Sequence, residues 1–403
     1  MLNIFNISAQ EIDSLDVQEE ERDSIRASLI TCTPGTDVYA HFGHTALRIT
    51  NLTTGEDVVF NYGCFDMSGS NFVINFMKGE TDYVVNAEPA DYFFARYDYM
   101  GNGVSEQILN LTQPECYRLA ELLFTNIQPE NRGYRYNWLY DNCTTRARDM
   151  IEKAIQGNVV YLYEEDKITP RNELHECLSN NSWLKLGIDL MLGSEIDQIV
   201  PRKIQQFIPS HYKADLNSAR IEYPIVVSVD SATNIPTLET KARSLVKEEI
   251  QILQEKDSNK TTDTFFTPNI AFSLLLIITI ALSIYDYKRK KTSIWYDALL
   301  HFAQGIAGII IAGLFFFSIH PGVSTNWQVI IFNPLYILYA VYLIYCHAKK
   351  KRDMLINVNT AVICIFAVVT LIAKQDINTS VWIMALTLCI RNLTRYHIIL
   401  KNK

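Results

Sequence analysis

The pattern of apolar and polar positions divides the chain into two unlike halves. Up to about residue 264 apolar residues are scattered among polar and acidic ones, whereas from Phe266 onward the sequence is almost continuously apolar. Five apolar segments follow one another in the second half, each near the ~20 residues that cross ~30 Å of hydrocarbon. They span residues 268–287, 297–319, 330–346, 355–373 and 380–399. The pattern predicts an all-α membrane domain of five transmembrane helices at 266–403.

Clusters of basic residues orient these segments. Residues 288–291 follow the first segment, 349–352 the third and 401–403 the fifth. Lys and Arg are enriched on the cytoplasmic side of membrane proteins, so all three clusters belong to that side. The polar half then faces outward, into the periplasm of a bacterium, and we expect a multi-pass protein of the inner membrane.

Arg391 lies inside the fifth apolar segment, where a charge is costly unless it is paired. Asp297 or His301 can supply the partner or bind a lipid headgroup with it. The alternative is an arginine close to the inner interface whose side chain extends toward water.

The polar half combines strand and helix patterns. A capping box at Thr112–Glu115 begins a helix that ends near Asn126, and Asn142 or Asp141 can cap a second helix that Gly157 closes. A Gly-containing loop at 51–56 joins two strands as a hairpin. The predicted strands cover residues 28–33, 45–50, 57–62, 81–86 and 103–111. These elements predict a small α+β domain with its His-bearing strands first and its Cys-bearing helix last.

Shifts in composition predict the domain boundaries. Residues 1–26 form a leader with part of a secretory signal, since the basic and apolar regions of a full signal are missing. A catalytic domain follows at 27–235. Apolar residues recur at helical spacing over 237–254, which predicts an amphipathic stalk helix inside a connecting segment at 236–265. An apolar patch at 183–192 is either ordinary core or a surface for membrane or acyl chains.

Charge and cysteine content narrow the function. A net charge of −8 and a pI near 5.6 argue against a nucleic-acid partner, which requires a basic face. The polar half has an odd number of cysteines, so at least one thiol stays free outside the cytoplasm. Cys143 is the candidate for the free thiol. The other four cysteines of the polar half, which allow three disulfide connectivities, are Cys32, Cys64, Cys116 and Cys177.

Cys143 and His44 are the candidate catalytic residues. Cys143 directly precedes a helix-like run, and a helix N-terminus stabilises a thiolate. His44 opens a strand-like run, and an imidazole beside the thiol can take its proton. The backbone N–H of Cys143, helped by the Asn142 side chain, can form an oxyanion hole. The alternative is a buried, inert cysteine.

Supporting roles are open to several neighbours. Tyr62, Asn61 or Asp141 can orient the imidazole, while Arg48 can meet a phosphate or a carboxylate. His41 flanks His44 or points elsewhere. A His41–His44 pair with Cys143 could hold zinc, but no acidic or Cys companion has a recognisable spacing, so we expect no metal and no cofactor.

Three motifs carry a family resemblance. Gly43-His44-Thr45, Phe60-Asn61-Tyr62-Gly63 and Asp141-Asn142-Cys143-Thr144-Thr145, followed by a multi-span tail, resemble the Lnb family of bacterial lipoprotein N-acyltransferases. The motif order is also similar to the permuted papain-like group that includes lecithin:retinol acyltransferases. The resemblance implies an α+β permuted papain-like periplasmic domain, with Cys143 as nucleophile and His44 as general base.

The same resemblance implies the substrates. A phospholipid would donate an acyl chain, which a Cys143 thioester would pass to the α-amine of a diacylated lipoprotein. A membrane-anchored thiol hydrolase acting on cell-wall peptides or lipids uses the same pair, and a non-enzymatic scaffold with a degenerate thiol fold is a further alternative.

Overall fold

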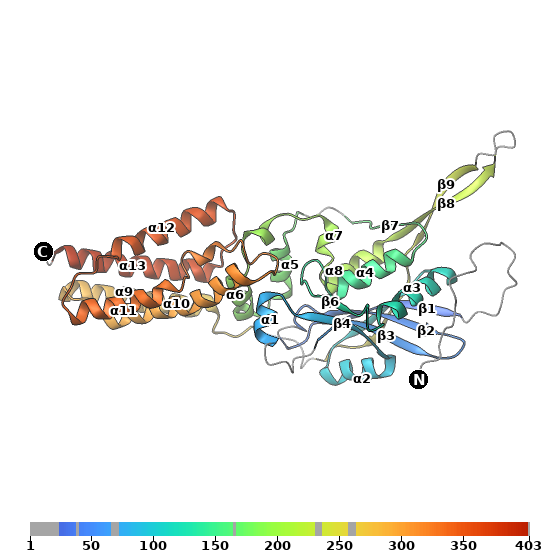
Figure 1. The fold of residues 1–403 in the computed structure, drawn as a ribbon, viewed down its shortest axis with the longest axis horizontal. Helices are drawn as coiled ribbons and strands as arrows, with labels where there is room; N and C mark the ends of the chain where they lie inside the picture. Colours follow the sequence, from blue (N-terminus) through green and yellow to red (C-terminus); the bar gives the residue numbers. More distant parts are fainter. Residues whose placement is uncertain are drawn as a thin grey trace.

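Alternating apolar residues in the first part of the chain form a seven-stranded antiparallel sheet. The computed structural model describes residues 24–37, 40–65, 72–163, 167–229, 236–256 and 263–401. The strand order is β10-β5-β1-β2-β3-β4-β6 (Figure 1). The strands are β1 (Ile25–Cys32), β2 (His44–Asn51), β3 (Asp57–Cys64), β4 (Asp82–Pro89), β5 (Val104–Leu109), β6 (Gly133–Arg135) and β10 (Val246–Leu253). The predicted hairpin of β2 and β3 is confirmed.

Helices cover both faces of this sheet, because successive side chains of a strand point to opposite faces. Leu29 and Leu47 lie opposite each other in β1 and β2 and pack beneath α3 (Gln113–Asn126) and α4 (Cys143–Ala154). Their neighbours Ile30 and Ala46 face α2 (Ala90–Met100) instead. The capping box predicted at Thr112 is present at the start of α3. The sheet is therefore the middle layer of an α/β domain.

The helices between this sheet and the C-terminal bundle are α5 (Pro170–Cys177), α6 (Ser182–Met191), η2 (Ser194–Asp197) and α7 (Arg202–Gln205), while α8 (Pro209–Ser218) returns to the sheet. Helix α1 (Phe72–Lys78) also lies at this junction (Figure 1). A second sheet contains β7 (Asn158–Val160), β8 (Arg220–Val229) and β9 (Pro236–Ser244). Its β8–β9 hairpin projects away from the bundle.

The predicted stalk helix at 237–254 is wrong. These residues form β9 and β10, separated at Leu245, whose N–H donates to the carbonyl of Ala219. Register shifts on either side of the central part of β10 interrupt its two-residue alternation, so the apolar positions imitate a helical period. The sheet domain consequently extends through Leu253, beyond the predicted boundary at residue 235. Ile25 belongs to β1 and not to a leader, and residues 1–23 lie outside the described residues.

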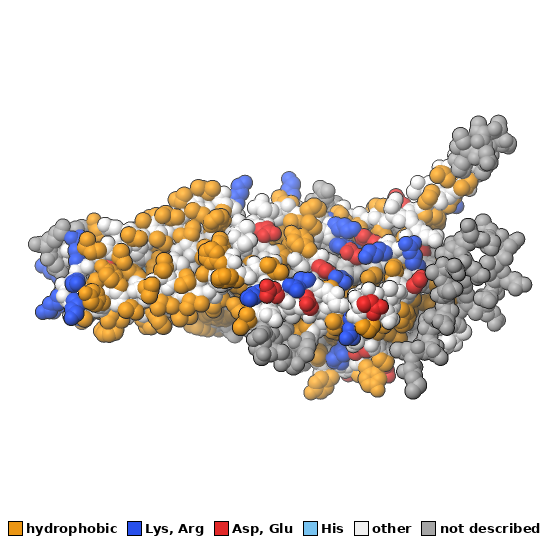
Figure 2. Space-filling view, in the orientation of Figure 1, with side chains coloured by type: hydrophobic (Ala, Val, Ile, Leu, Met, Phe, Trp, Pro, Cys, Tyr) orange, Lys and Arg blue, Asp and Glu red, His pale blue; other side chains and the backbone are white. Residues whose placement is uncertain are grey.

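Each of the five predicted apolar segments overlaps one helix of the C-terminal bundle. They are α9 (Pro268–Arg289), α10 (Ile294–Phe317), α11 (Leu335–Ala348), α12 (Ile356–Ile372) and α13 (Thr379–Lys401). By length and hydropathy, α9 and α10 each suffice to cross a membrane, and α11 and α12 are shorter. Figure 2 shows an apolar bundle surface with Lys and Arg gathered at its far end, where α13 also ends. This distribution agrees with the predicted orientation.

Five charged residues form a cluster inside this bundle, which we call the bundle charge cluster: Arg391, Arg395, Asp286, Asp297 and Asp353. The Arg391 guanidinium donates to Asp297 at 2.6 Å and to Asp286 at 3.0 Å. Arg395 donates to Asp353 at 2.6 Å. All five residues are buried, so of the two candidate partners Asp297 is the one that pairs with Arg391, and the alternative of a side chain extending toward water is wrong.

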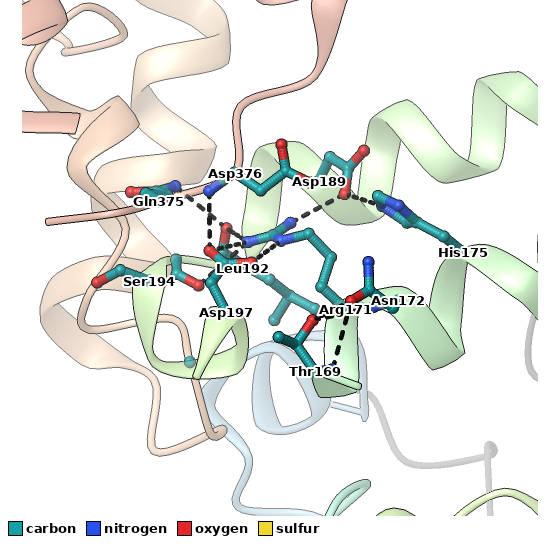
Figure 3. Close-up of polar contacts among 12 residues, drawn as sticks. Thr169, Arg171, Asn172, His175, Asp189, Leu192, Ser194, Asp197, Gln375 and Asp376 are labelled. Carbon is teal, nitrogen blue, oxygen red and sulfur yellow. Dashed lines mark hydrogen bonds and ion pairs between the residues drawn. The ribbon is translucent and has the colours of Figure 1, made fainter. Parts of the chain in front are cut away.

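A second buried ionic cluster joins the bundle to helices α5 and α6. Arg171 of α5 donates to Asp189 of α6 at 2.9 Å and to Asp197 at 2.5 Å (Figure 3). From the segment between α12 and α13, the backbone N–H of Asp376 donates to Asp197 at 3.1 Å, and the Asn378 amide donates to Asp189 at 2.8 Å. These bonds tie the two domains together.

Candidate active site

The structure brings Cys143 and His44 together at one end of the sheet. Cys143 is the first residue of α4 and His44 the first residue of β2, and the thiol and imidazole lie close enough that each shifts the pKa of the other. Gly43 turns the chain into β2 with φ of +76°. A Cβ at this position would lie 2.8 Å from the carbonyl oxygen of Cys32, so the turn requires glycine.

Asn142 places Cys143 by capping α4. Its side-chain oxygen accepts the backbone N–H groups of Thr144 at 2.8 Å and Thr145 at 3.0 Å. Its amide nitrogen donates to the carbonyls of Trp138 and Phe207. Both ends of the Asn142 amide are thus occupied, so the predicted help from this side chain in an oxyanion hole is not available. The residue fixes the helix start that carries the thiol.

Asn61 orients the imidazole. It lies in β3 opposite Ala46, and its side-chain oxygen lies 2.6 Å from Nε2 of His44. The Asn61 amide nitrogen donates in turn to Glu88 at 3.4 Å, which defines which end of the amide faces the ring. An amide oxygen only accepts, so Nε2 carries the proton and Nδ1 is left for the thiol.

Glu88 and Arg96 fix the position of the Asn61 side chain on the side away from His44. The two guanidinium nitrogens of Arg96 each donate to a different oxygen of Glu88 at 2.7 Å. A bidentate pair of this kind restricts the rotation of the carboxylate that accepts the Asn61 amide. Tyr97, the next residue of α2, stacks over the His44 ring with the centroids 6.4 Å apart. Cys143, His44, Asn61, Glu88 and Arg96 therefore form one connected row.

The charges at the pair favour a reactive thiol. Burial raises the pKa of the Cys143 thiol, but the charge and hydrogen bond of His44 and the backbone N–H of Thr45 outweigh it, so the net pKa is lowered. Burial lowers the pKa of His44, and here too the attraction and hydrogen bonding of Cys143, with the Asn61 bond, reverse the sign. The pair can form a thiolate beside an imidazolium, the arrangement of a thiol nucleophile with its base.

Two predicted partners of the imidazole lie elsewhere. Tyr62 points to the opposite face of β3, where its hydroxyl donates to Asn126 at 2.9 Å. Burial raises its pKa, and it packs in the core beneath α3 and α4. Asp141 forms a bidentate pair with Arg146, at 2.6 and 2.8 Å. Neither residue orients His44, because alternation along β3 and the pairing with Arg146 direct both side chains away.

Arg48 and His41 also have structural partners. Arg48 donates to Asp57 and to Glu106 at 2.9 Å, so its charge is already neutralised without a phosphate. His41 is buried, with Nδ1 2.7 Å from the carbonyl of Asp37 and Nε2 3.0 Å from the Asn181 amide. It binds the α5–α6 turn and does not share a ligand site with His44.

The described residues contain no group of three or more His, Cys, Asp or Glu side chains that could hold a metal ion. All eight cysteines are free, so none of the three disulfide connectivities considered from the sequence occurs. The site is a thiol–imidazole–amide row without a neighbouring crosslink.

Glu88, Arg96 and Tyr97 were not found from the sequence. Glu88 lies in β4 and Arg96 in the following helix α2, eight residues apart, so no helical spacing relates the two side chains. To choose between Asn61 and Tyr62 as the partner of His44, one must know which face of β3 each side chain occupies. The pattern of apolar and polar residues around them does not distinguish the two faces.

Comparisons with known proteins agree with this division of the chain. Residues 18–171 match the Lnb N-terminal periplasmic domain, and residues 260–403 match the Lnb transmembrane domain. Neither a curated protein nor a solved structure matches the chain.

Proposed function

The chain belongs to the Lnb family, with a periplasmic N-terminal domain and a C-terminal transmembrane domain, and from this premise we propose that it is a lipoprotein N-acyltransferase. In this proposal it moves an acyl chain from a phospholipid to the α-amine of a diacylglyceryl-cysteine lipoprotein. The supporting observation is the Cys143–His44–Asn61 row, placed in a domain that is bonded to a membrane bundle. We further propose five membrane crossings in the inner membrane and a permuted papain-like arrangement, with the sheet facing the periplasm.

The first half-reaction forms a thioester. The Cys143 thiolate attacks the ester carbonyl of the donor phospholipid, and the carbonyl oxygen takes the charge of the tetrahedral intermediate. The start of α4 lends its partial positive charge to that oxygen. The C–O bond to glycerol then breaks, Nδ1 of His44 passes its proton to the alkoxide, and a lysophospholipid leaves.

The second half-reaction forms an amide. The α-amine of the lipoprotein cysteine attacks the thioester carbonyl, and His44 accepts the proton that the nitrogen loses. The C–S bond breaks, and the sulfur leaves as the Cys143 thiolate, so the imidazolium–thiolate pair is restored. An amide is more stable than the thioester from which it forms, so the transfer proceeds without a nucleotide.

Replacing the nucleophile tests this proposal. The full-length protein with Cys143→Ala is expressed in cells that depend on it for N-acylation, and lipoprotein N-termini are analysed by mass spectrometry. We expect no triacylated product, while Cys364→Ala, at an exposed position of α12, retains wild-type amounts. Wild-type acylation by Cys143→Ala excludes the thioester route. Release of lysophospholipid by the unaltered protein without any acylated amine would instead assign the site to a hydrolase.

A further inference from the structure

A cavity of about 420 Å³ lies at the junction of the two domains, apart from the Cys143–His44 pair. Its wall includes His175 of α5, Ser182 and Lys185 of α6, and the first residues of α9 and α13. Figure 3 shows the neighbouring ionic cluster, with His175 and Asp189 on one side and Asp376 reaching in from the segment before α13. The cavity thus joins groups from the periplasmic helices and the bundle.

With the bundle crossing the membrane as proposed above, the cavity lies at the level of lipid headgroups. Pro268 begins α9 and Thr379 begins α13, so both lining segments are the points where the apolar bundle starts. Trp183 donates its indole N–H to the carbonyl of Phe266 at 2.7 Å, and both aromatic rings are exposed beside Phe265. Exposed Trp side chains such as Trp183 are enriched at the membrane–water interface. A group in the cavity is therefore at the depth of a phosphate and not of an acyl chain.

The charges around the cavity are of both signs and are partly uncompensated. The Lys185 ammonium has no hydrogen bond or ion pair with the described part of the chain, and the same holds for the side-chain carboxylate of the exposed Asp376. Asp263 is exposed and accepts the hydroxyl of Ser182 at 2.8 Å. By contrast, Asp189 is paired with Arg171 at 2.9 Å and hydrogen-bonded to His175 at 2.7 Å. One free ammonium and two rim carboxylates remain for a ligand.

We propose that this cavity binds the zwitterionic headgroup of an aminophospholipid, with the phosphate at Lys185 and the primary ammonium at Asp376 and Asp263. A purely anionic headgroup would meet the two carboxylates, whereas a phosphate joined to an amine matches both signs. A quaternary ammonium is recognised by aromatic side chains, and none lines the cavity, so a primary amine fits better. If the proposed transfer reaction holds, this lipid is the acyl donor.

One residue connects the cavity to the catalytic row. The Asn181 oxygen accepts the N–H of Leu184 and so caps α6, the helix that carries Lys185. The Asn181 nitrogen contacts His41, three residues before His44, at 3.0 Å. Asn181 therefore contacts both the helix that carries Lys185 and the loop that leads to His44.

Lipid binding to the full-length Cys143→Ala protein in detergent tests this inference without relying on catalysis. Native mass spectrometry compares phosphatidylethanolamine, phosphatidylglycerol and phosphatidylcholine at equal concentrations. We expect phosphatidylethanolamine to bind about tenfold more tightly than the other two, as for the loss of one charge-assisted contact. Equal binding of the three lipids would overturn the proposal.

Three further variants assign the contacts. Lys185→Gln should weaken binding of phosphatidylethanolamine about tenfold, and Asp376→Asn should reduce its advantage over phosphatidylglycerol. Lys241→Gln, an exposed lysine of β9 far from the junction, is the control and should leave binding unchanged. Binding that is unaffected by Lys185→Gln and Asp376→Asn contradicts the site, whatever the outcome of the acylation experiment.

Discussion

The bundle charge cluster and the Cys143–His44–Asn61 row are both polar groups enclosed in protein, yet they differ in what their charges can do. Arg391 and Arg395 are permanent cations, and both are paired with buried aspartates from other segments of the bundle. Cys143 and His44 can exchange a single proton, and each makes the charged form of the other more favourable. A buried charge with a permanent partner therefore supports structure, whereas a buried pair that titrates together supports chemistry.

Removing the imidazole should have the largest effect. His44→Ala takes away the group that accepts and returns the proton, so acyl transfer should fall by about 10³-fold, within the range for general acid–base catalysis. The rate of lysophospholipid release, followed with the protein in lipid vesicles, measures this loss. The thermal midpoint should stay close to that of the unaltered protein. A rate within tenfold of the original would show that His44 is not the base.

Breaking the bundle charge cluster should lower the free energy of unfolding. The molecules that remain folded should keep their rate of acyl transfer. Asp297→Asn leaves two arginines with less negative charge in a buried setting, at a cost of about 3–5 kcal/mol. Thermal unfolding in detergent should show a lower midpoint, while Glu239→Gln on the exposed face of β9 serves as the control. An unchanged midpoint for Asp297→Asn would contradict the view that these charges compensate one another.

A substitution of Asn61 tests the orientation of the His44 ring separately from proton transfer by that ring. Asn61→Ala leaves the ring free to rotate, and activity should fall about 10- to 100-fold, as for other residues that orient a reactive group. Tyr62→Phe, on the opposite face of β3, removes only the hydrogen bond to Asn126 and should keep activity within about twofold. The same assay of acyl transfer compares the two. Similar losses for both variants would mean that β3 acts through its fold and not through the amide.

The pH dependence of alkylation measures the coupling directly. Because the pKa of Cys143 is lowered, its thiolate should appear, and react with iodoacetamide, at a lower pH than an ordinary thiol of pKa ~8.5. In His44→Asn only burial and weaker hydrogen bonds remain, so the inflection should move upward and the rate at pH 7 should fall about tenfold. Mass spectrometry of the Cys143 peptide follows the reaction. An unchanged profile would mean that the two residues do not share a proton.

Much of this architecture could be predicted from local sequence. Thr112 and Asn142 predicted the starts of α3 and α4, and the loop at 51–56 predicted the β2–β3 hairpin. The lengths of the apolar segments predicted the five helices of the bundle. These features depend on residues close together in the chain. The helix predicted at 237–254 failed because β9 pairs with the neighbouring strand β8, and β10 pairs with β5, which is far away in sequence. Those pairings override the local period.

The amino-acid sequence by itself determined that a thiol would begin a helix, that an imidazole would begin a strand, and that an apolar bundle would follow. Caps, periods and apolar length act over a few residues, so one sequence is enough to predict them. Only the tertiary structure decided that Asn61 and not Tyr62 faces His44, and that Arg391 has two carboxylate partners. It also decided that Lys185 and Asp376 border one cavity. Contacts between distant segments depend on strand register and helix packing, which the folded chain as a whole sets.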